Sequence, residues 1–494
     1  MCRCKTDSKI FKERPKMEIN EKRLRNGEIN VLKCRDDHNF VLFKEIDGSD
    51  FKLAHDSQCT WIKADDTFGP SKLRERIEPW LTALGQSEYF SLLIGSGLSE
   101  AVHRIATTNE ANPHGEGIKG MQLANWTVFS SQIKDAMEKS AQLAGRNTSN
   151  IEDQIRVANE MLKGIQHYCP ESAKFRGSKK LKKEIQKFKI ETVQMLNNFS
   201  TNILKSEKDI ILAEEEKLEE AFGYLISFLM SFASRSGIRD RLQIFTTNYD
   251  RLIEAGAEMA GLHLLDRFVG TLSPIFRSSR LNIDMHYNPP GIRGEPRYLE
   301  GIVRFTKLHG SLDWIDCGDK IRRLGLPFGA ISIDPYLNTA GLNNINYDSL
   351  MIYPNEAKDR ETAEYPYVEL FRDFASSICR PNNTLVTYGY GFGDEHINRV
   401  IEDMLTIPST HLVVISHSDP IGRIMQIYKK LSRPAQTTLI IGNQLGDLKT
   451  LVDYYLPKPA IDRTTFKMAE LLKNRIGTEQ KNENNSSETT RGVL

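Results

Sequence analysis

Cysteine is scarce in this sequence, and its spacing excludes the usual zinc modules. The chain has 494 residues and seven cysteines, at positions 2, 4, 34, 59, 169, 317 and 379. Only Cys2 and Cys4 lie close together and no CxxC pair occurs, so a structural zinc site of the usual spacing is not expected. An odd number of scattered cysteines is typical of reduced thiols in a cytosolic protein.

Long hydrophobic runs and an excess of one charge are also missing. The most apolar stretch, residues 225–233, is too short to cross a bilayer, and the first sixteen residues lack the apolar core of a signal peptide. With 66 basic and 65 acidic side chains the net charge is +1, so the overall charge favours neither nucleic acid nor an anionic membrane. We therefore expect a cytoplasmic protein that binds neither a membrane nor, directly, nucleic acid.

From about residue 76 onward, short apolar runs alternate with amphipathic segments. The runs predict strands at 89–94, 243–247, 303–308, 385–388, 412–416 and 437–441. The intervening segments predict helices at 252–259, 398–405, 421–431 and 448–456. Repeated strand–helix units imply an α/β fold with a doubly wound parallel sheet and helices on both faces.

Three regions fall outside this alternation. Apolar residues spaced by threes and fours predict long helices at about 130–240, either an insertion with a solvated outer face or a partner-binding surface. Residues 1–75 are polar, contain short β-like pieces such as 40–43, and could form a small module or an assembly arm. Residues 457–494 predict a C-terminal helix and, after about 474, a disordered tail.

Two polar motifs follow the first predicted strands. The segment GSGLS at 95–99 can form a tight turn whose backbone N–H groups approach a pyrophosphate. It is not a complete GxGxxG, because Glu100 replaces the third glycine, and Gly-Ser turns are common. In TTNYD at 246–250, Asn248 can hydrogen-bond a sugar hydroxyl or a water. Asp250 could orient this loop or simply cap the next helix.

Two further motifs follow later strands. The segment KLHGSLDW at 307–314 places His309 at a strand end before Gly310, where the imidazole has room to face a cleft, although a lone histidine is often structural. In GYGFGDEHIN at 389–398, three glycines in five residues suit a loop that passes close to a nucleotide, with Asp394 near a helix start. Ligands of doubly wound sheets bind at the carboxyl ends of the strands, which is where all four motifs lie.

In this order, and each at a strand end, the four motifs resemble the sirtuin family, specifically its bacterial branch found in anti-phage defence proteins. That branch carries GxGxS, TxNYD, KLHGS and GYG/SFGDxxI segments, and 95–99, 246–250, 307–311 and 389–397 match them in turn. Further matches lie at 150–153 (NIED), 352–354 (IYP) and 365–367 (YPY). The resemblance covers roughly residues 85–455 and implies a Rossmann-like, NAD-binding domain over 76–456 with the helical insertion inside it.

Two elements of the classical sirtuin deacylases are absent from the sequence. No GIPxFR segment follows the glycine turn, and only Cys317 lies where classical members hold a four-cysteine zinc module after the histidine. Because that module helps to form the acyl-lysine groove, its absence argues against deacylation. The resemblance then leaves NAD⁺ cleavage with water as the acceptor, and no zinc is expected.

The resemblance also implies roles for single residues. Asn248 would position the ribose or the attacking water, His309 would act as general base, and Asp250 would orient the Asn248 loop. The residues expected to bind NAD⁺ are Gly95, Ser96, Gly97 and Ser99 at the pyrophosphate, Thr247, and Gly391 and Asp394 near the adenosine half.

The implied activity is hydrolysis of NAD⁺, the substrate, to nicotinamide and ADP-ribose, by an NAD-depleting effector of anti-phage defence. Two alternatives remain open: a regulatory or scaffold subunit that binds NAD⁺ or ADP-ribose without turnover, and a protein-lysine deacylase. Relatives in this branch pair with a HerA-type hexameric ATPase or with Argonaute proteins. Because the chain ends shortly after its sirtuin-like region, we expect a homo-oligomer with a HerA-like partner.

Overall fold

The fold is taken from a computed structural model. It describes residues 29–458 except 35–36, 38, 48–49, 55–56, 58, 64, 144–145, 147, 169–178, 236–238, 280–284, 288–296, 299–300, 319, 338–346 and 353–364. The expected C-terminal helix and tail therefore lie almost entirely outside the described residues, as do Tyr353 and Pro354 of the IYP segment.

An eleven-stranded sheet forms the centre of the molecule, in the order β4-β3-β2-β1-β18-β17-β16-β5-β6-β12-β7. The seven strands from β18 to β7 are parallel. They are β5 (Tyr89–Ile94), β6 (Gln243–Thr246), β7 (His263–Leu265), β12 (Ile302–Lys307), β16 (Asn383–Tyr388), β17 (His411–Ser416) and β18 (Thr437–Ile441). The predicted α/β fold with a doubly wound sheet is confirmed.

The described part of the N-terminal region continues this sheet. Strands β1 (Asn30–Lys33), β2 (Val41–Asp47), β3 (Asp50–Leu53) and β4 (Thr67–Phe68) join its β18 edge as antiparallel neighbours. The buried Lys33 donates hydrogen bonds to the carbonyls of Pro434 (2.6 Å) and Thr437 (3.1 Å), which ties β1 to the segment before β18. An assembly role for this region stays a prediction.

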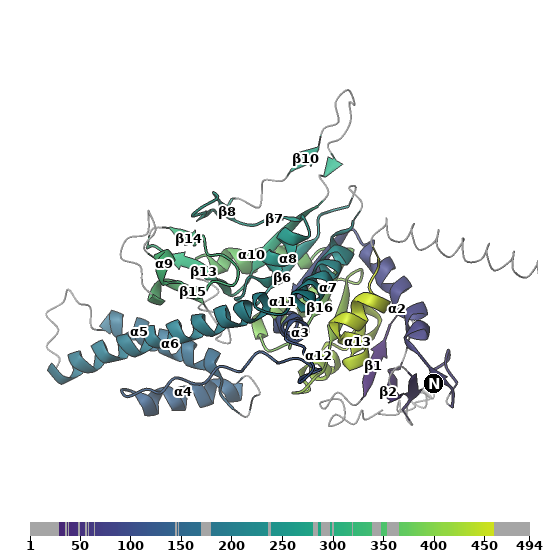
Figure 1. The fold of residues 1–494 in the computed structure, drawn as a ribbon, viewed down its shortest axis with the longest axis horizontal. Coiled ribbons are helices and arrows are strands. Elements are labelled where there is room, and N and C mark those ends of the chain that lie inside the picture. The colour runs from purple at the N-terminus through teal and green to yellow at the C-terminus, as the bar shows by residue number, and fades with distance from the viewer. Residues whose placement is uncertain are drawn as a thin grey trace, which may run out of the picture.

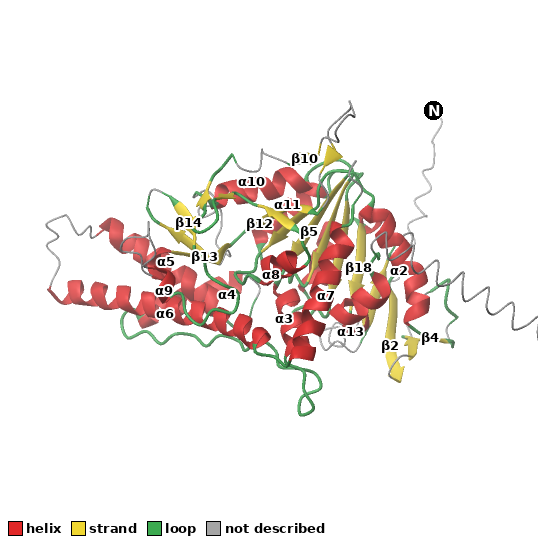
Figure 2. Cartoon of the chain, turned by 45° about the horizontal axis from the view of Figure 1, so that its top comes forward, coloured by secondary structure: helices red, strands yellow, loops and turns green. Residues whose placement is uncertain are grey.

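Helices cover both faces of the sheet (Figure 1). One face carries α2 (Pro70–Gly85), α3 (Ser96–Ala106), α7 (Glu215–Ala233) and α8 (Leu252–Met259), and the other carries α10 (Tyr367–Ile378), α11 (Glu395–Met404) and α12 (Arg423–Leu431). Figure 2 shows the strands lying between these two layers. An apolar core lies between the sheet and each helix layer. In β17, Val413 packs into the core beneath the α2, α3, α7 and α8 layer and Val414 into the core beneath the α10–α12 layer, because successive side chains of a strand point to opposite faces. Burial on both faces explains the continuous apolar runs in the sequence.

The helical insertion extends to one side of the sheet (Figure 1). It contains α4 (Ser130–Leu143), α5 (Ile151–Tyr168) and α6 (Lys179–Ile211), and α7 leads back to the sheet. Buried residues such as Phe188, Met195 and Phe199 recur along α6 at helical spacing, as the sequence pattern predicts.

A second, smaller sheet is formed by strands that come before and after β12 in the chain. Its order is β15-β13-β14-β9-β8. The strands are β8 (Phe268–Val269), β9 (Ile275–Phe276), β13 (Gly310–Asp316), β14 (Ile321–Arg323) and β15 (Leu350–Ile352). A third apolar core joins this sheet to the insertion and includes Leu312, Phe199 and Tyr249. The insertion is therefore packed against the loop after β6, where the second motif lies.

Short elements complete the described chain. They are the hairpin of β10 (His286–Tyr287) and β11 (Arg297–Tyr298), the helices α9 (Asp334–Leu337), α13 (Asn443–Gly446) and α14 (Leu448–Thr450), the 3-10 turns η2 (Tyr347–Ser349) and η3 (Pro434–Gln436), and the π-helical turn η4 (Leu451–Tyr455). Among the helices of the described residues, none combines the length and the apolar character that crossing a membrane requires.

The order of the parallel strands locates a crevice. From β5 the chain passes to β6 and β12 on one side, and later returns to β16 on the other side of β5. The winding direction thus reverses between β5 and β16. In open α/β sheets ligands bind at such a switch point, beside the carboxyl ends of the strands.

Candidate functional site

At the switch point two glycine loops touch through their backbones. The N–H of Gly97 donates to the carbonyl of Gly389 (3.1 Å), and the N–H of Gly95 donates to the carbonyl of Tyr388 (3.0 Å). A Cβ on Gly97 would lie 2.5 Å from the Cα of Gly389, which is itself in the left-handed region at φ +60°. These glycines are therefore required by close approach of the two loops, whatever else they do.

These contacts define which parts of the glycine loops a ligand can reach. Gly95 caps α3, and Ser96, the first residue of that helix, is exposed. Gly391 is also exposed, and no heavy atom lies within 4 Å of the position that a Cβ would take there. Because the first turn of a helix presents N–H groups and a positive dipole end, α3 fits an anionic pyrophosphate. The predicted roles of Gly95, Gly97 and Gly391 in binding NAD⁺ stay predictions.

Asn248 is held by a chain of hydrogen bonds. Its Nδ2 donates to the carbonyl of Gly95 (3.1 Å) and to Oγ of Ser99 (3.0 Å). The Ser99 hydroxyl in turn donates to Oδ2 of Asp250 (2.7 Å). With both amide hydrogens engaged, the Oδ1 of Asn248 is the atom that can accept a hydrogen bond from a sugar hydroxyl or a water.

Asp250 uses both of its carboxylate oxygens in local hydrogen bonds. Its Oδ2 accepts from Ser99, while its Oδ1 accepts from the backbone N–H of Leu252 (3.1 Å) at the start of α8. The Ser99 hydroxyl, which we predicted at the pyrophosphate, is placed between Asn248 and Asp250. Thr247 is half-buried, and its N–H extends the β5–β6 ladder to the carbonyl of Ile94 (3.3 Å).

His309 pairs with a carboxylate that comes from the fourth motif. Its Nε2 lies 2.8 Å from Oδ2 of Asp394, and both side chains are buried. The other oxygen of Asp394 accepts from the N–H groups of His396 (2.8 Å) and Ile397 (3.2 Å), so this residue also caps α11. A carboxylate fixed in this way orients the imidazole and leaves Nδ1 as the ring nitrogen that Asp394 does not contact. The sequence placed Asp394 near a helix start, but its pairing with His309 was missed.

Asn248 and His309 leave the sheet at the same edge. Strands β6 and β12 are parallel neighbours, with Thr246 opposite Lys307, and each of the two site residues follows two positions later. The ring of Tyr249 lies 6.3 Å from that of His309 between centroids, and Phe199 of α6 packs edge-on against Tyr249 at 5.6 Å. Through these rings the insertion reaches the edge that carries Asn248 and His309.

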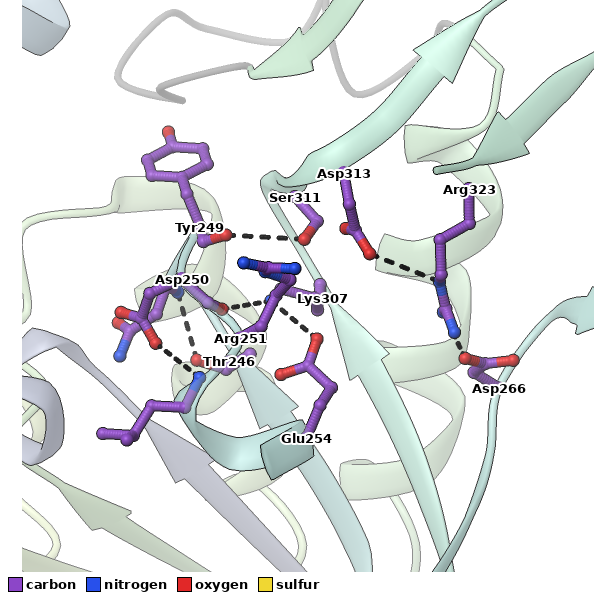
Figure 3. A network of polar contacts seen from close by, with 12 residues as sticks. Thr246, Tyr249, Asp250, Arg251, Glu254, Asp266, Lys307, Ser311, Asp313 and Arg323 are labelled. Carbon is purple, nitrogen blue, oxygen red and sulfur yellow. Dashed lines mark hydrogen bonds and ion pairs between the residues drawn. The ribbon is translucent and has the colours of Figure 1, made fainter. Parts of the chain in front are cut away.

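Below this edge lies a network of buried charges (Figure 3). Lys307 donates from Nζ to the carbonyl of Asp250 and to Oε1 of Glu254 (2.8 Å). Burial raises the pKa of Glu254, and the nearby ammonium of Lys307 opposes that rise. Lys307 therefore anchors the loop that carries Asn248, a role that its place in the third motif did not reveal.

A second buried pair ties the insertion to the same loop. Arg251 is bonded to both carboxylate oxygens of Glu207 on α6, and also to the carbonyls of Leu326 and Pro327. Burial alone would lower the pKa of Arg251, but attraction to the Glu207 carboxylate raises it above its ordinary value. The guanidinium thus stays charged, and it joins the loop before α8 to helix α6 and to the segment 326–327.

One further acidic residue, in the insertion, has a perturbed pKa. Glu152, in the first turn of α5, is half-buried, and burial raises its pKa, whereas attraction to His309 is the largest opposing influence. The NIED match had pointed to this segment without assigning it a role. Within the described part of the chain, no three His, Cys, Asp or Glu side chains are grouped so as to hold a metal ion.

Comparison with known proteins identifies part of this arrangement. Residues 242–434 match the family model of the SIR2-like domain, a segment that holds Asn248, His309 and Asp394 but begins after the first glycine loop and the insertion. No curated protein matches the chain. A SIR2-like domain is compatible with an NAD-related activity. Over residues 242–434 the chain is therefore sirtuin-like in sequence, on a Rossmann-like fold.

Proposed function

We propose that the protein is an NAD⁺ glycohydrolase. One observation carries this proposal: Asn248 and His309 lie at the same edge of neighbouring parallel strands, and each is oriented by a carboxylate, Asp250 through Ser99 and Asp394 directly. This edge adjoins the switch point, where the first turn of α3 can receive a pyrophosphate.

The residues suggest how the reaction would proceed. Nicotinamide leaves with the electron pair of its bond to the ribose carbon, which becomes positively charged as the bond breaks. A water oxygen then bonds to that carbon, and Nδ1 of His309 accepts the proton that the water loses. Asp394 stabilises the resulting imidazolium, and Oδ1 of Asn248 accepts a hydrogen bond from the water or from a ribose hydroxyl. The low exposure of Asn248 (6%) and His309 (8%) keeps other water away.

Nicotinamide release from NAD⁺ by purified variants tests this proposal. We expect Asn248→Ala and His309→Ala each to lower kcat by about 10²–10⁴-fold, because each removes a group that acts on the reacting atoms. His263→Ala, at an exposed position of β7, is the matched histidine control and should keep the activity of the wild type. Wild-type turnover by both site variants, with their folds intact, would reject the proposal.

A second candidate function is binding of NAD⁺ or ADP-ribose without turnover. The first turn of α3 at the switch point favours it, because this turn can receive a pyrophosphate whether or not the bond to nicotinamide is broken. Tight NAD⁺ binding by calorimetry, with no nicotinamide released under any condition, would support this candidate over hydrolysis. Formation of O-acyl-ADP-ribose only when an acylated peptide is present would instead point to deacylation.

The biological setting follows from the resemblance to the defence branch. We propose that NAD⁺ depletion serves anti-phage defence and that a homo-oligomer is controlled by a HerA-like ATPase. Nicotinamide release measured with and without the product of the neighbouring gene tests this control. Equal rates in the two assays would argue against it.

A further inference from the structure

The imidazole of His309 is held by more than its bond to Asp394. That bond joins Nε2 of His309 to Oδ2 of Asp394 at 2.8 Å. The χ2 torsion of a histidine has broad minima, so one hydrogen bond restricts the ring less tightly than a bond combined with a contact from a second ring. The direction of Nδ1, the atom that would accept the proton of the attacking water, therefore depends also on what packs beside the imidazole.

The ring of Tyr249 lies beside the imidazole. Its centroid is 6.3 Å from that of His309, with 39° between the ring planes, a separation within the range of interacting aromatic rings. Tyr249 is 8% exposed and belongs to the apolar core that joins the insertion to the smaller sheet. Because side chains in such a core are closely packed, this ring offers the imidazole a fixed surface.

The backbone of Tyr249 is tied to the segment that carries His309. The N–H of Leu312 donates to the Tyr249 carbonyl (3.1 Å), and the hydroxyl of Ser311 donates to the same oxygen (3.4 Å). Figure 3 shows this carbonyl facing Ser311, with the Tyr249 ring pointing away from the buried charges. Tyr249 thus joins the second motif to the third, and it directly follows Asn248 in the chain.

The insertion supports the Tyr249 ring. Phe199, buried on α6, packs edge-on against it with 5.6 Å between centroids and 80° between ring planes. The same helix is fixed to the loop after β6 by Glu207, which bonds the side chain of Arg251 two residues beyond Tyr249. A ring contact and an ion pair, eight residues apart on α6, therefore hold one short loop.

We infer that Tyr249 is a positioning residue that directs Nδ1 of His309 toward the attacking water, with its own ring kept in place by Phe199; the inference rests on the proposed function. A general base must lie within hydrogen-bond reach of the proton that it accepts, and a misplacement of about 1 Å can cost about 10²-fold in rate. The insertion then takes part in the reaction through aromatic packing, without a polar group of its own on the substrate.

Kinetics of aromatic substitutions test this inference. We expect Tyr249→Leu to lower kcat for nicotinamide release about tenfold with little change in KM, and Tyr249→Phe, which keeps the ring, to recover most of that loss. Phe199→Leu should lower kcat by about threefold, since it loosens the ring at one remove. Phe188→Leu is the control, because Phe188 is also buried on α6 but packs on Trp126 and Phe129 instead.

Two further measurements ask whether Tyr249 acts through His309. In a His309→Ala background, Tyr249→Leu should cause no additional loss of kcat. In protein labelled with ¹³C at histidine, the signal that disappears in His309→Ala belongs to His309, and a nearby aromatic ring shifts it. We expect Tyr249→Leu and Phe199→Leu to move this signal and Phe188→Leu to leave it in place.

The histidine signal separates this inference from the proposed function, because it needs no turnover. If the signal responds as expected but the wild type releases no nicotinamide, the proposed hydrolysis fails and the contact that orients His309 stands. Wild-type kcat with an unmoved signal in Tyr249→Leu would overturn the inference. So would a Tyr249→Phe variant as slow as Tyr249→Leu, which would transfer the role to the hydroxyl, or equal losses of kcat in Phe188→Leu and Phe199→Leu, which would indicate general loosening of the core.

Discussion

The two sides of the crevice are held together by different interactions. On the β5–β16 side the loops meet backbone to backbone, through Gly97 and Gly389, with no side chain between them. On the β6–β12 side the loop after β6 is held by buried charged side chains, chiefly Arg251 with Glu207 and Lys307 with Glu254. The β5–β16 side thus requires residues without a Cβ atom, and the β6–β12 side requires that its charged side chains be paired.

This difference teaches how each side should respond to change. A backbone contact buries no charge, but it has no room for even one added carbon. A buried ion pair tolerates small shifts in shape, but the loss of one partner leaves a charge in a medium that solvates it poorly. The substitutions below test the two sides in turn.

The largest effect should come from the charged side. We expect Glu207→Gln to lower the free energy of unfolding by about 3–5 kcal/mol, because Arg251 would remain buried without a counter-charge. Denaturant unfolding measures this change. Glu75→Gln, which breaks an exposed pair with Lys72, should cost about 0–1 kcal/mol, and an equally small cost for Glu207→Gln would show that the pair does not hold the loop.

The glycine side should show a somewhat smaller effect that depends sharply on position. Gly389→Ala places a Cβ 2.6 Å from the Cα of Gly97 at a left-handed φ, and we expect it to cost about 2–3 kcal/mol. Gly391→Ala, two residues further along the same loop, meets no atom and should stay within about 0.5 kcal/mol of the wild type.

The same pair of glycine variants also tests the ligand role of the loop. If Gly391 approaches the adenosine half of NAD⁺, Gly391→Ala should raise KM for NAD⁺ while the unfolding midpoint stays unchanged. Equal stability of the two variants would contradict the close backbone crossing, and an unchanged KM would remove Gly391 from the binding site.

The smallest effect is expected where the two sides join. Ser99 belongs to α3 but hydrogen-bonds Asn248 and Asp250, so Ser99→Ala should cost about 1 kcal/mol of stability. Loss of the orientation of Asn248 should lower kcat by about tenfold, equivalent to about 1.4 kcal/mol. Ser231→Ala, which removes a local hydrogen bond on α7, is the control. An unaltered kcat would mean that Asn248 needs no support from Ser99.

The parallel strands and their flanking helices could be predicted because their signals are local. Buried parallel strands are continuous apolar runs, and β5 and β18 begin and end at the predicted residues. The helix predicted at 398–405 begins earlier, at Glu395, because Asp394 caps it. Pattern alone did not show that β1 pairs with β18, since these strands are about four hundred residues apart and neither carries a signal for its partner.

The residues of the candidate site come from the sequence motifs, but their contacts could not be read from the motifs. The motifs identified Asn248, Asp250, His309 and Asp394, yet the His309–Asp394 pair joins residues 85 positions apart. The motifs also gave Ser99 and Lys307 no part in supporting Asn248 or its loop.

By itself, the order of apolar runs and glycine turns determined that this chain forms a doubly wound sheet with polar residues at the carboxyl ends of its strands. These features depend on backbone geometry and burial, which each segment encodes locally. Tertiary structure alone decided which carboxylate meets His309, which cation neutralises Glu254, and that the inserted helix α6 brings Glu207 to Arg251. Those pairings depend on distances of a few ångströms between segments far apart in the chain, and only the completed packing sets them.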